Sequence, residues 1–177
     1  LKYIGEYALV SYTIISYVNT IVVMSMTGIA QGTQPLISYY YGKNESEKYK
    51  KLLKYGMVAA AAGSVAAVLI CYVGAESIVG LFLKESEASL SVYSVRVLRI
   101  FILSFLLAGL NVVLGGYFTS VEKAGFATMI SLTRSLIALV ISLVFLTAVF
   151  GGEAIWWAPL IAESCCLVLS AGLYQWY

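Results

Sequence analysis

Long stretches without a charged side chain constrain this sequence more than any other feature. The segments 7–42, 55–75 and 100–121 contain no Asp, Glu, Lys or Arg, and each is at least as long as the roughly 20 residues that cross the core of a bilayer. Of the whole chain 61% is hydrophobic and 11% is charged, whereas soluble domains carry about 25% charged residues. Because these stretches recur along the whole chain, neither a soluble domain nor a cleavable signal peptide accounts for them.

Five membrane-spanning helices can be placed on the sequence. Their expected ranges are 7–41, 51–72, 92–118, 124–150 and 154–176. In lipid a chain must satisfy its own backbone N–H and C=O groups, so these segments are expected to be helices rather than open strands. A short helix at the membrane surface is expected over 75–82. The sequence therefore predicts an all-α polytopic bundle of about five transmembrane helices, in a single membrane domain over residues 1–177.

Lysine and arginine are unevenly divided between the two expected sides of the membrane. One side carries Lys43, Lys48, Lys50, Lys51, Lys54 and Lys123, and the other carries Lys2, Lys84, Arg96 and Arg99. Because cytoplasmic loops carry an excess of positive charge, we expect residues 43–54 and the C-terminus to be cytoplasmic, with the chain in the inner (plasma) membrane. In the same turn Asn44 is expected to cap the second helix, with Glu47 completing a capping box.

Several classes of function find no support in the composition. A net charge of +2, scattered along the chain, does not indicate a nucleic-acid partner. The chain has no histidine, and Cys71, Cys165 and Cys166 lie in apolar runs without metal-ligand spacing, so we expect buried thiols, no metal and no cofactor. No nucleophile is grouped with a base, so we do not expect an enzyme.

Both ends of the chain are typical of an excerpt from a longer membrane protein. It begins Leu1-Lys2 without Met, and it ends Tyr174-Gln175-Trp176-Tyr177 at an aromatic belt without a polar tail. We therefore expect the functional protein to contain further helices, and membrane lipid to be its surroundings.

Uncharged polar side chains interrupt two of the expected helices. Gln31 and Gln34 lie three residues apart and so share a face. An amide facing lipid is costly, so we interpret this face either as making interhelical hydrogen bonds or as one wall of a water-filled substrate path. Tyr39 is interpreted as an interfacial anchor, with stacking on a ligand as the alternative. Asn111, in a glycine-flanked helix interior, either bonds a neighbouring helix or contacts a ligand.

Two charged side chains lie deep within the expected helices. Arg134 is 11 residues past Lys123, or roughly 16 Å along a helix. Glu163 is 10 residues past Glu153, or roughly 15 Å in from the other side. In a core about 30 Å thick both reach the middle, so we expect them to pair or to face one cavity. Ionisable groups inside a membrane are candidates for function, and we weigh a structural ion pair against a role in proton or ion coupling.

One segment carries a family resemblance. GIAQGTQPLISYYYGKNESEKYKKLLKYG (28–56) resembles the signature of the multidrug and toxic compound extrusion (MATE) family. The matching residues are Gly28, Gln31, Gly32, Gln34, Pro35, Tyr39, Tyr41 and Gly42. Members usually have Asn where this chain has Tyr40. Three later blocks, beginning at Gly74, Gly115 and Gly151, are similar to the family's outer segment, arginine-bearing helix and last helix, in the same order.

The resemblance implies a fold and an activity. Members have twelve helices in two lobes of six, and they export cationic or amphipathic drugs in exchange for sodium ions or protons. This chain would correspond to helices eight to twelve, most of the second lobe, so its partners would be a small organic substrate and the missing N-terminal lobe. Some sodium-coupled members carry an acidic residue where this chain has Ala108, which leaves H⁺ or Na⁺ coupling to the other lobe or to Glu163.

Two other functions stay open from the residues. A flippase for lipid-linked sugars, or a polysaccharide exporter, would share the helical plan, although such paths need a more cationic cavity than a lone Arg134 supplies. A structural membrane subunit would use the same polar groups only for packing. Because the proposed site needs both lobes, we expect this fragment to be inactive alone.

Overall fold

A computed structural model describes residues 5–83 and 88–176, and within these ranges the chain forms helices and turns without a strand. Five helical segments there are long and apolar enough to cross a membrane. They are Glu6–Gly42, Ser46–Val73, Ala88–Ser120, Ala124–Phe150 and Gly152–Trp176. The predicted all-α membrane bundle and its five spans are confirmed. The largest difference is in the second span, which begins at Ser46 rather than near Lys51.

Several spans are built from more than one helical element. The α-helices are α1 (Glu6–Gly42), α2 (Ser46–Val73), α3 (Ala75–Gly80), α4 (Ala88–Phe101), α5 (Phe105–Ser120), α6 (Ala124–Leu132), α7 (Ala138–Phe150) and α8 (Ala158–Trp176). A 3₁₀ turn, Ile102–Ser104, joins α4 to α5, and another, Gly152–Trp157, leads into α8. A π-helical segment, Thr133–Ile137, joins α6 to α7. The short α3 confirms that a helix follows the second span, although it ends at Gly80 rather than at residue 82; its place at the membrane surface stays a prediction.

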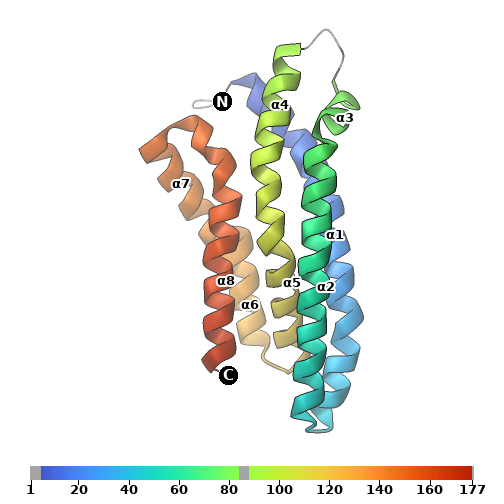
Figure 1. The fold of residues 1–177 in the computed structure, drawn as a ribbon. Coiled ribbons are helices and arrows are strands. Elements are labelled where there is room, and N and C mark those ends of the chain that lie inside the picture. Colours follow the sequence, from blue (N-terminus) through green and yellow to red (C-terminus); the bar gives the residue numbers. More distant parts are fainter. Residues whose placement is uncertain (1–4, 84–87, 177) are drawn as a thin grey trace.

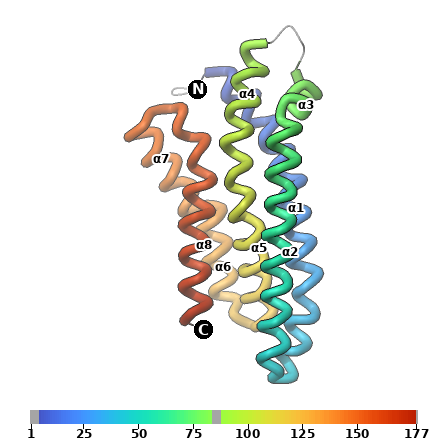
Figure 2. Tube along the Cα trace, viewed as in Figure 1, coloured from blue at the N-terminus to red at the C-terminus, as the bar shows by residue number. Residues whose placement is uncertain are grey.

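The span formed by α4 and α5 runs through the middle of the bundle (Figure 1). On one side α5 packs against α1 and α2, which run antiparallel to each other, and on the other side it packs against α6 and α8. Figure 2 follows the same path along the Cα trace. The turn after α1, the turn between α5 and α6, and the C-terminal end of α8 all lie at one end of the bundle. The segments expected on the same side of the membrane therefore share one end of the bundle, and which side that is stays a prediction.

Close approach between α5 and its neighbours α1 and α2 depends on a small residue. A Cβ added at Gly109 would lie 2.4 Å from Ser64 Oγ on α2 and 3.0 Å from Met26 Sδ on α1. Ser64 donates to that same sulfur at 3.7 Å. In lipid no hydrophobic force drives helices together, so van der Waals packing across small residues holds them. The missing side chain at Gly109 therefore sets how closely the three helices pack.

The turn between α1 and α2 corrects one local prediction. Glu45, and not Asn44, occupies the cap position of α2, and no side chain makes a capping hydrogen bond there. Asn44 instead has a φ of 57°, in the left-handed region that Asn tolerates better than most residues. The Asn44–Glu47 capping box is therefore wrong, because the chain needs a left-handed residue where the cap was expected. Lys48 forms an ion pair with Glu45 in this turn.

The cysteines also differ in part from expectation. Cys71 and Cys166 are buried, as predicted, whereas Cys165 is exposed. Consecutive residues on a helix point about 100° apart, so α8 cannot bury both Cys165 and Cys166 against the bundle.

Candidate substrate cavity

A cavity of about 1240 Å³ opens between α1 on one side and α5, α6, α7 and α8 on the other. Its polar, uncharged lining residues are Ser16, Asn19, Thr27, Gln31, Gln34, Ser104, Asn111, Thr119, Thr128, Ser131 and Ser135. Among the described residues that line it, only Arg134 and Glu163 carry a charge. The cavity therefore collects the intramembrane polar groups of helices that are far apart in sequence, and its two charges cancel.

The two charged residues are in direct contact. Arg134 Nε donates a hydrogen bond to Glu163 Oε1 at 2.6 Å. The side chains are mostly buried, at 22% exposure for Arg134 and 11% for Glu163. Their equal depth predicts that they pair or face one cavity, and the structure shows both the contact and the shared cavity. Whether the pair couples an ion stays a prediction.

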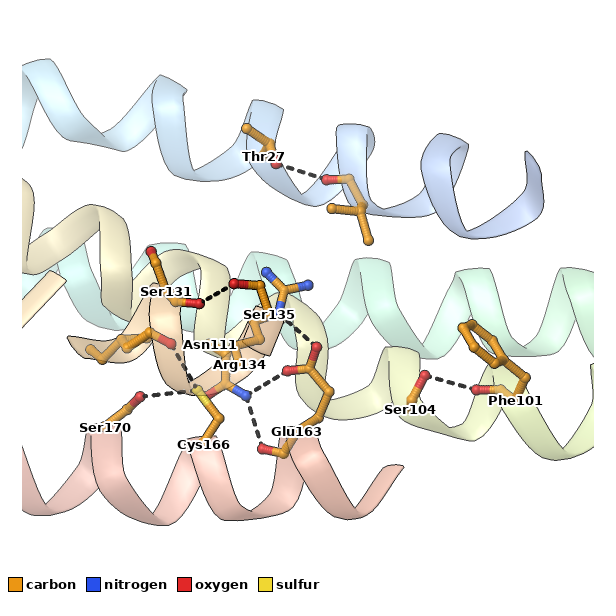
Figure 3. Close-up of polar contacts among 12 residues, drawn as sticks. Thr27, Phe101, Ser104, Asn111, Ser131, Arg134, Ser135, Glu163, Cys166 and Ser170 are labelled. Carbon is orange, nitrogen blue, oxygen red and sulfur yellow. Dashed lines mark hydrogen bonds and ion pairs between the residues drawn. The ribbon is translucent and has the colours of Figure 1, made fainter. Parts of the chain in front are cut away.

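Asn111 of α5 completes this cluster (Figure 3). Its Nδ2 donates to Glu163 Oε2 at 2.7 Å and to the Glu163 backbone oxygen at 2.9 Å. Asn111 is 1% exposed, and its Oδ1 has no hydrogen-bond partner among the described residues. Both carboxylate oxygens of Glu163 are therefore engaged, one by Arg134 and one by Asn111. Of the two interpretations of Asn111, the interhelical hydrogen bond is present.

The backbone around Arg134 departs from regular α-helix. Thr133–Ile137 is π-helical, with regular α-helix on both sides. Such segments are rare and occur most often as single turns at functional sites. Here the π turn carries the arginine of the cluster. This π turn was not predicted, because no proline or glycine marks it in the sequence.

The face of α1 that lines the cavity, called here the α1 wall, carries more polar residues than the two predicted ones, Gln31 and Gln34. Ser16, Asn19 and Thr27 line the cavity together with Gln31 and Gln34. Their spacings of three, four and eight residues keep them on one face of a helix. A search of the first span for polar residues at helical spacing would have found the additional three.

Gln34 is held against α5 by close contact. A Cβ added at Gly116 would lie 2.9 Å from Gln34 Nε2 and 3.4 Å from Ala30 Cβ. A larger residue at 116 would therefore displace the amide. This packing contact places Gln34 at the seam between α1 and α5, where both helices line the cavity.

Tyr39 lies apart from this group. It is not among the cavity-lining residues, and it is 54% exposed. Its ring contacts the Tyr40 ring at a centroid distance of 5.2 Å, and Lys43 Nζ lies 4.4 Å from the Tyr39 ring centroid. Tyrosine beside lysine near a helix end is typical of a membrane interface, so the anchor interpretation fits this position better than ligand stacking.

Ala108 lies in the cavity wall and is 3% exposed. No carboxylate is therefore present at the position that the resemblance matches to an acidic residue of some sodium-coupled members. In the described ranges no three His, Cys, Asp or Glu side chains come together as a candidate metal site. Glu163 is thus the acidic side chain that this part of the protein brings to the cavity.

Comparison with known proteins finds similarity over most of the chain. A family model described as MatE matches residues 1–144. The multidrug export protein MepA of Staphylococcus haemolyticus (strain JCSC1435) is 26% identical over 166 residues, which cover 94% of this chain and 36% of that protein. MepA of Staphylococcus aureus (strain bovine RF122 / ET3-1) is 24% identical with the same coverage. The chain thus spans about a third of the length of these relatives.

Solved structures show the same fold. An outward-facing multidrug resistance MATE family transporter of the MOP superfamily superposes with a TM-score of 0.89 at 16% identity, over 97% of this chain and 39% of that one. An inward-facing structure of such a transporter gives 0.82 at 16% identity, over 94% of this chain and 38% of that one. With the family model matching most of the sequence, these findings confirm the resemblance seen in the motif around Gln31 and Gln34: the chain belongs to the MATE family.

Proposed function

We propose that this chain forms most of the C-terminal lobe of a secondary active antiporter, which exports organic cationic or amphipathic compounds in exchange for H⁺ or Na⁺. The observation that carries the proposal is the single cavity that gathers Gln31, Gln34, Asn111, Arg134 and Glu163. A structural subunit would need these groups only where helices touch, and it would not need a polar space of about 1240 Å³ between them. The names of the relatives, multidrug export proteins, support the same function.

The rest of the relatives' length supplies the second wall of the site. Secondary transporters place substrate and ion sites between two repeats near the middle of the bilayer and rock one repeat against the other. The chain corresponds to about a third of the relatives. The missing N-terminal lobe is therefore proposed as the partner that closes the cavity, and the fragment alone is proposed to be inactive.

The orientation follows from the positive charges. The lysine-rich turn 43–54 lies at the same end of the bundle as the C-terminal end of α8. Because positive residues are retained on the cytoplasmic side, we place both in the cytoplasm and the bundle in the inner (plasma) membrane. The cavity then lies on the route from the cytoplasm to the outside.

Glu163 is the proposed ion-coupling residue of this lobe. It is the acidic group in the cavity wall, and it is held by Arg134 and Asn111 on two different helices. A proton or Na⁺ arriving there would compete with Arg134, so ion binding would be transmitted to the π-helical segment. The zero net charge of the lining weighs against a flippase for lipid-linked sugars, whose phosphate groups would need several cationic side chains.

The test uses the full gene product in a bacterium that lacks its own drug pumps. Efflux of a cationic dye is measured for the unchanged protein and for a variant with Gln31→Leu and Gln34→Leu. We expect energy-dependent efflux by the unchanged protein, and normal membrane insertion with reduced efflux for the variant. Dye retention equal to that of cells without the protein would reject the export function.

Coupling is tested separately in liposomes. Transport is driven by a pH gradient or by a Na⁺ gradient, for the unchanged protein and for Glu163→Gln. A carboxamide cannot release a proton and binds Na⁺ weakly, so the variant should lose its response to the gradient. An unchanged response would place ion coupling outside this lobe.

A further inference from the structure

The two members of the ion pair differ in how far their hydrogen-bonding groups are used. Glu163 accepts from Arg134 at Oε1 and from Asn111 at Oε2, and the residue as a whole is 8% exposed. A cation that bound this carboxylate would share its oxygens with these two donors. Each oxygen of the negative member therefore already has one donor within the protein.

Arg134 is in the opposite situation. It contacts Glu163 through Nε alone, and in the described part of the chain no hydrogen bond or ion pair involves its two terminal nitrogens. Figure 3 shows these nitrogens on the side of the guanidinium that faces away from Glu163. Arg134 lines the cavity. The guanidinium thus presents to the cavity the pair of parallel N–H groups that matches a carboxylate in a bidentate arrangement.

We propose that Arg134 binds a carboxylate of the transported compound, with Glu163 acting as a positioning residue that fixes the guanidinium through Nε. This inference rests on the proposed export function and names one class within its amphipathic substrates, compounds with a free carboxylate, including zwitterions. Such a carboxylate would supply two charged acceptors to the terminal nitrogens of Arg134, whereas an ester would supply only weaker, neutral acceptors. The apolar part of such a compound has a surface to contact, since Val112, Leu139 and Leu143 also line the cavity.

The test compares two dyes that differ only at one carboxyl group, which is free in one dye and esterified in the other. Equilibrium binding to the purified full gene product is measured for a rhodamine with a free carboxylate and for its ethyl ester. We expect the acid to bind at least about tenfold more tightly, the ratio that corresponds to about 1.4 kcal/mol, as charge-assisted hydrogen bonds supply. Arg134→Gln should bring the two affinities to the same value by weakening the acid and leaving the ester unchanged.

Three further variants serve as controls for this comparison. Arg96→Gln removes an exposed arginine that does not line the cavity and should keep the full preference for the acid. Arg134→Lys retains the charge but loses the planar fork, so it should lose most of the preference even if Arg134→Gln fails to fold. Glu163→Gln keeps an oxygen that can accept from Arg134 Nε and removes a competing negative charge, so acid binding should be equal or tighter.

The outcomes separate this inference from the export function. Equal binding of the two dyes by the unchanged protein, together with efflux of both, would overturn the carboxylate site while leaving export intact. Tighter binding of the ester, lost in Glu163→Gln, would overturn it in favour of a cation site at Glu163. Absence of both binding and efflux would reject the export function and this inference with it.

Discussion

The two walls of the cavity satisfy their polar groups in different ways. On α1 the hydroxyls bond within their own helix, as Ser16 does to the Tyr12 carbonyl at 2.8 Å and Thr27 does to the Val23 carbonyl at 2.9 Å. On the opposite wall hydroxyls such as that of Ser135 also bond within their own span, but the amide and the charged groups bond between elements, from Asn111 on α5 and Arg134 on the π segment to Glu163 on α8. The hydroxyls of Ser16 and Thr27 are thus satisfied within α1, whereas the opposite wall also holds a network that joins three elements.

This difference predicts where the protein tolerates change. When a hydroxyl that bonds the carbonyl four residues earlier is removed, no group on another helix loses its hydrogen-bond partner. Removing one charged member of a buried ion pair leaves the other charge unpaired, which costs far more than the net value of the bond. We therefore expect steep losses of stability where a charge of the α5–α8 wall is removed and shallow losses on the α1 wall.

The largest loss should come from Glu163→Ala. It leaves the Arg134 charge without its partner and removes an acceptor from Asn111, so we expect about 3–5 kcal/mol less stability against unfolding. The measurement is the free energy of unfolding of the full gene product in detergent micelles. Exporter activity is a separate readout and is not needed for this test.

The matched control replaces both charges. Arg134→Met combined with Glu163→Met leaves no unpaired ion, and paired buried charges are often replaced by apolar residues without loss. The double variant should therefore be more stable than Glu163→Ala. If it is equally unstable, the loss comes from packing and the network interpretation of this wall is wrong.

Gly109→Ala should give the next largest loss of unfolding free energy. The α1 wall is held to α5 by close packing rather than by a charge network, and the new Cβ would lie 2.4 Å from Ser64 Oγ and 3.0 Å from Met26 Sδ. Overpacking of this kind costs about 1–3 kcal/mol. The same unfolding measurement applies, with Gly109→Ala plus Ser64→Ala expected to recover part of the loss.

Gly63→Ala is the control on the facing helix. Its nearest neighbour would be the flexible end of Met26, at 3.4 Å from Cε, so the change should be neutral or slightly stabilising. An equal loss of unfolding free energy for both substitutions would show that an added methyl group is not tolerated at Gly63 either. The close contacts at Gly109 would then not explain the loss.

Asn111→Leu should lower the free energy of unfolding less than Glu163→Ala or Gly109→Ala. Hydrogen bonds between membrane helices are worth about 0.6 kcal/mol on average and about 1.7 kcal/mol at most. The substitution also removes Oδ1, which is buried without a partner among the described residues. The expected loss of unfolding free energy therefore lies in the lower part of that range, and a loss as large as that of Glu163→Ala would mean that Asn111 is the centre of the network.

The sequence predicted the helices well because hydrophobic length and charge-free runs are local properties. It also predicted the contact of Arg134 with Glu163, since equal depth on consecutive helices leaves few other partners. It could not predict that Asn111 bonds Glu163, because the rotation of α5 about its axis is set by tertiary packing at Gly109. Nor could it predict the π turn at Arg134, which depends on the neighbours of the helix rather than on its own residues.

Thr27→Val should have the smallest effect and gives the sharpest check on the α1 wall. Valine keeps the shape of threonine and removes only a hydroxyl that bonds the Val23 carbonyl of the same helix, so stability should change by no more than about 0.5 kcal/mol. The measurement is again the free energy of unfolding of the full gene product. A loss above about 1 kcal/mol would mean that Thr27 bonds across the cavity to the other lobe in the complete protein. The two walls would then be parts of one polar network, and the contrast between them would disappear.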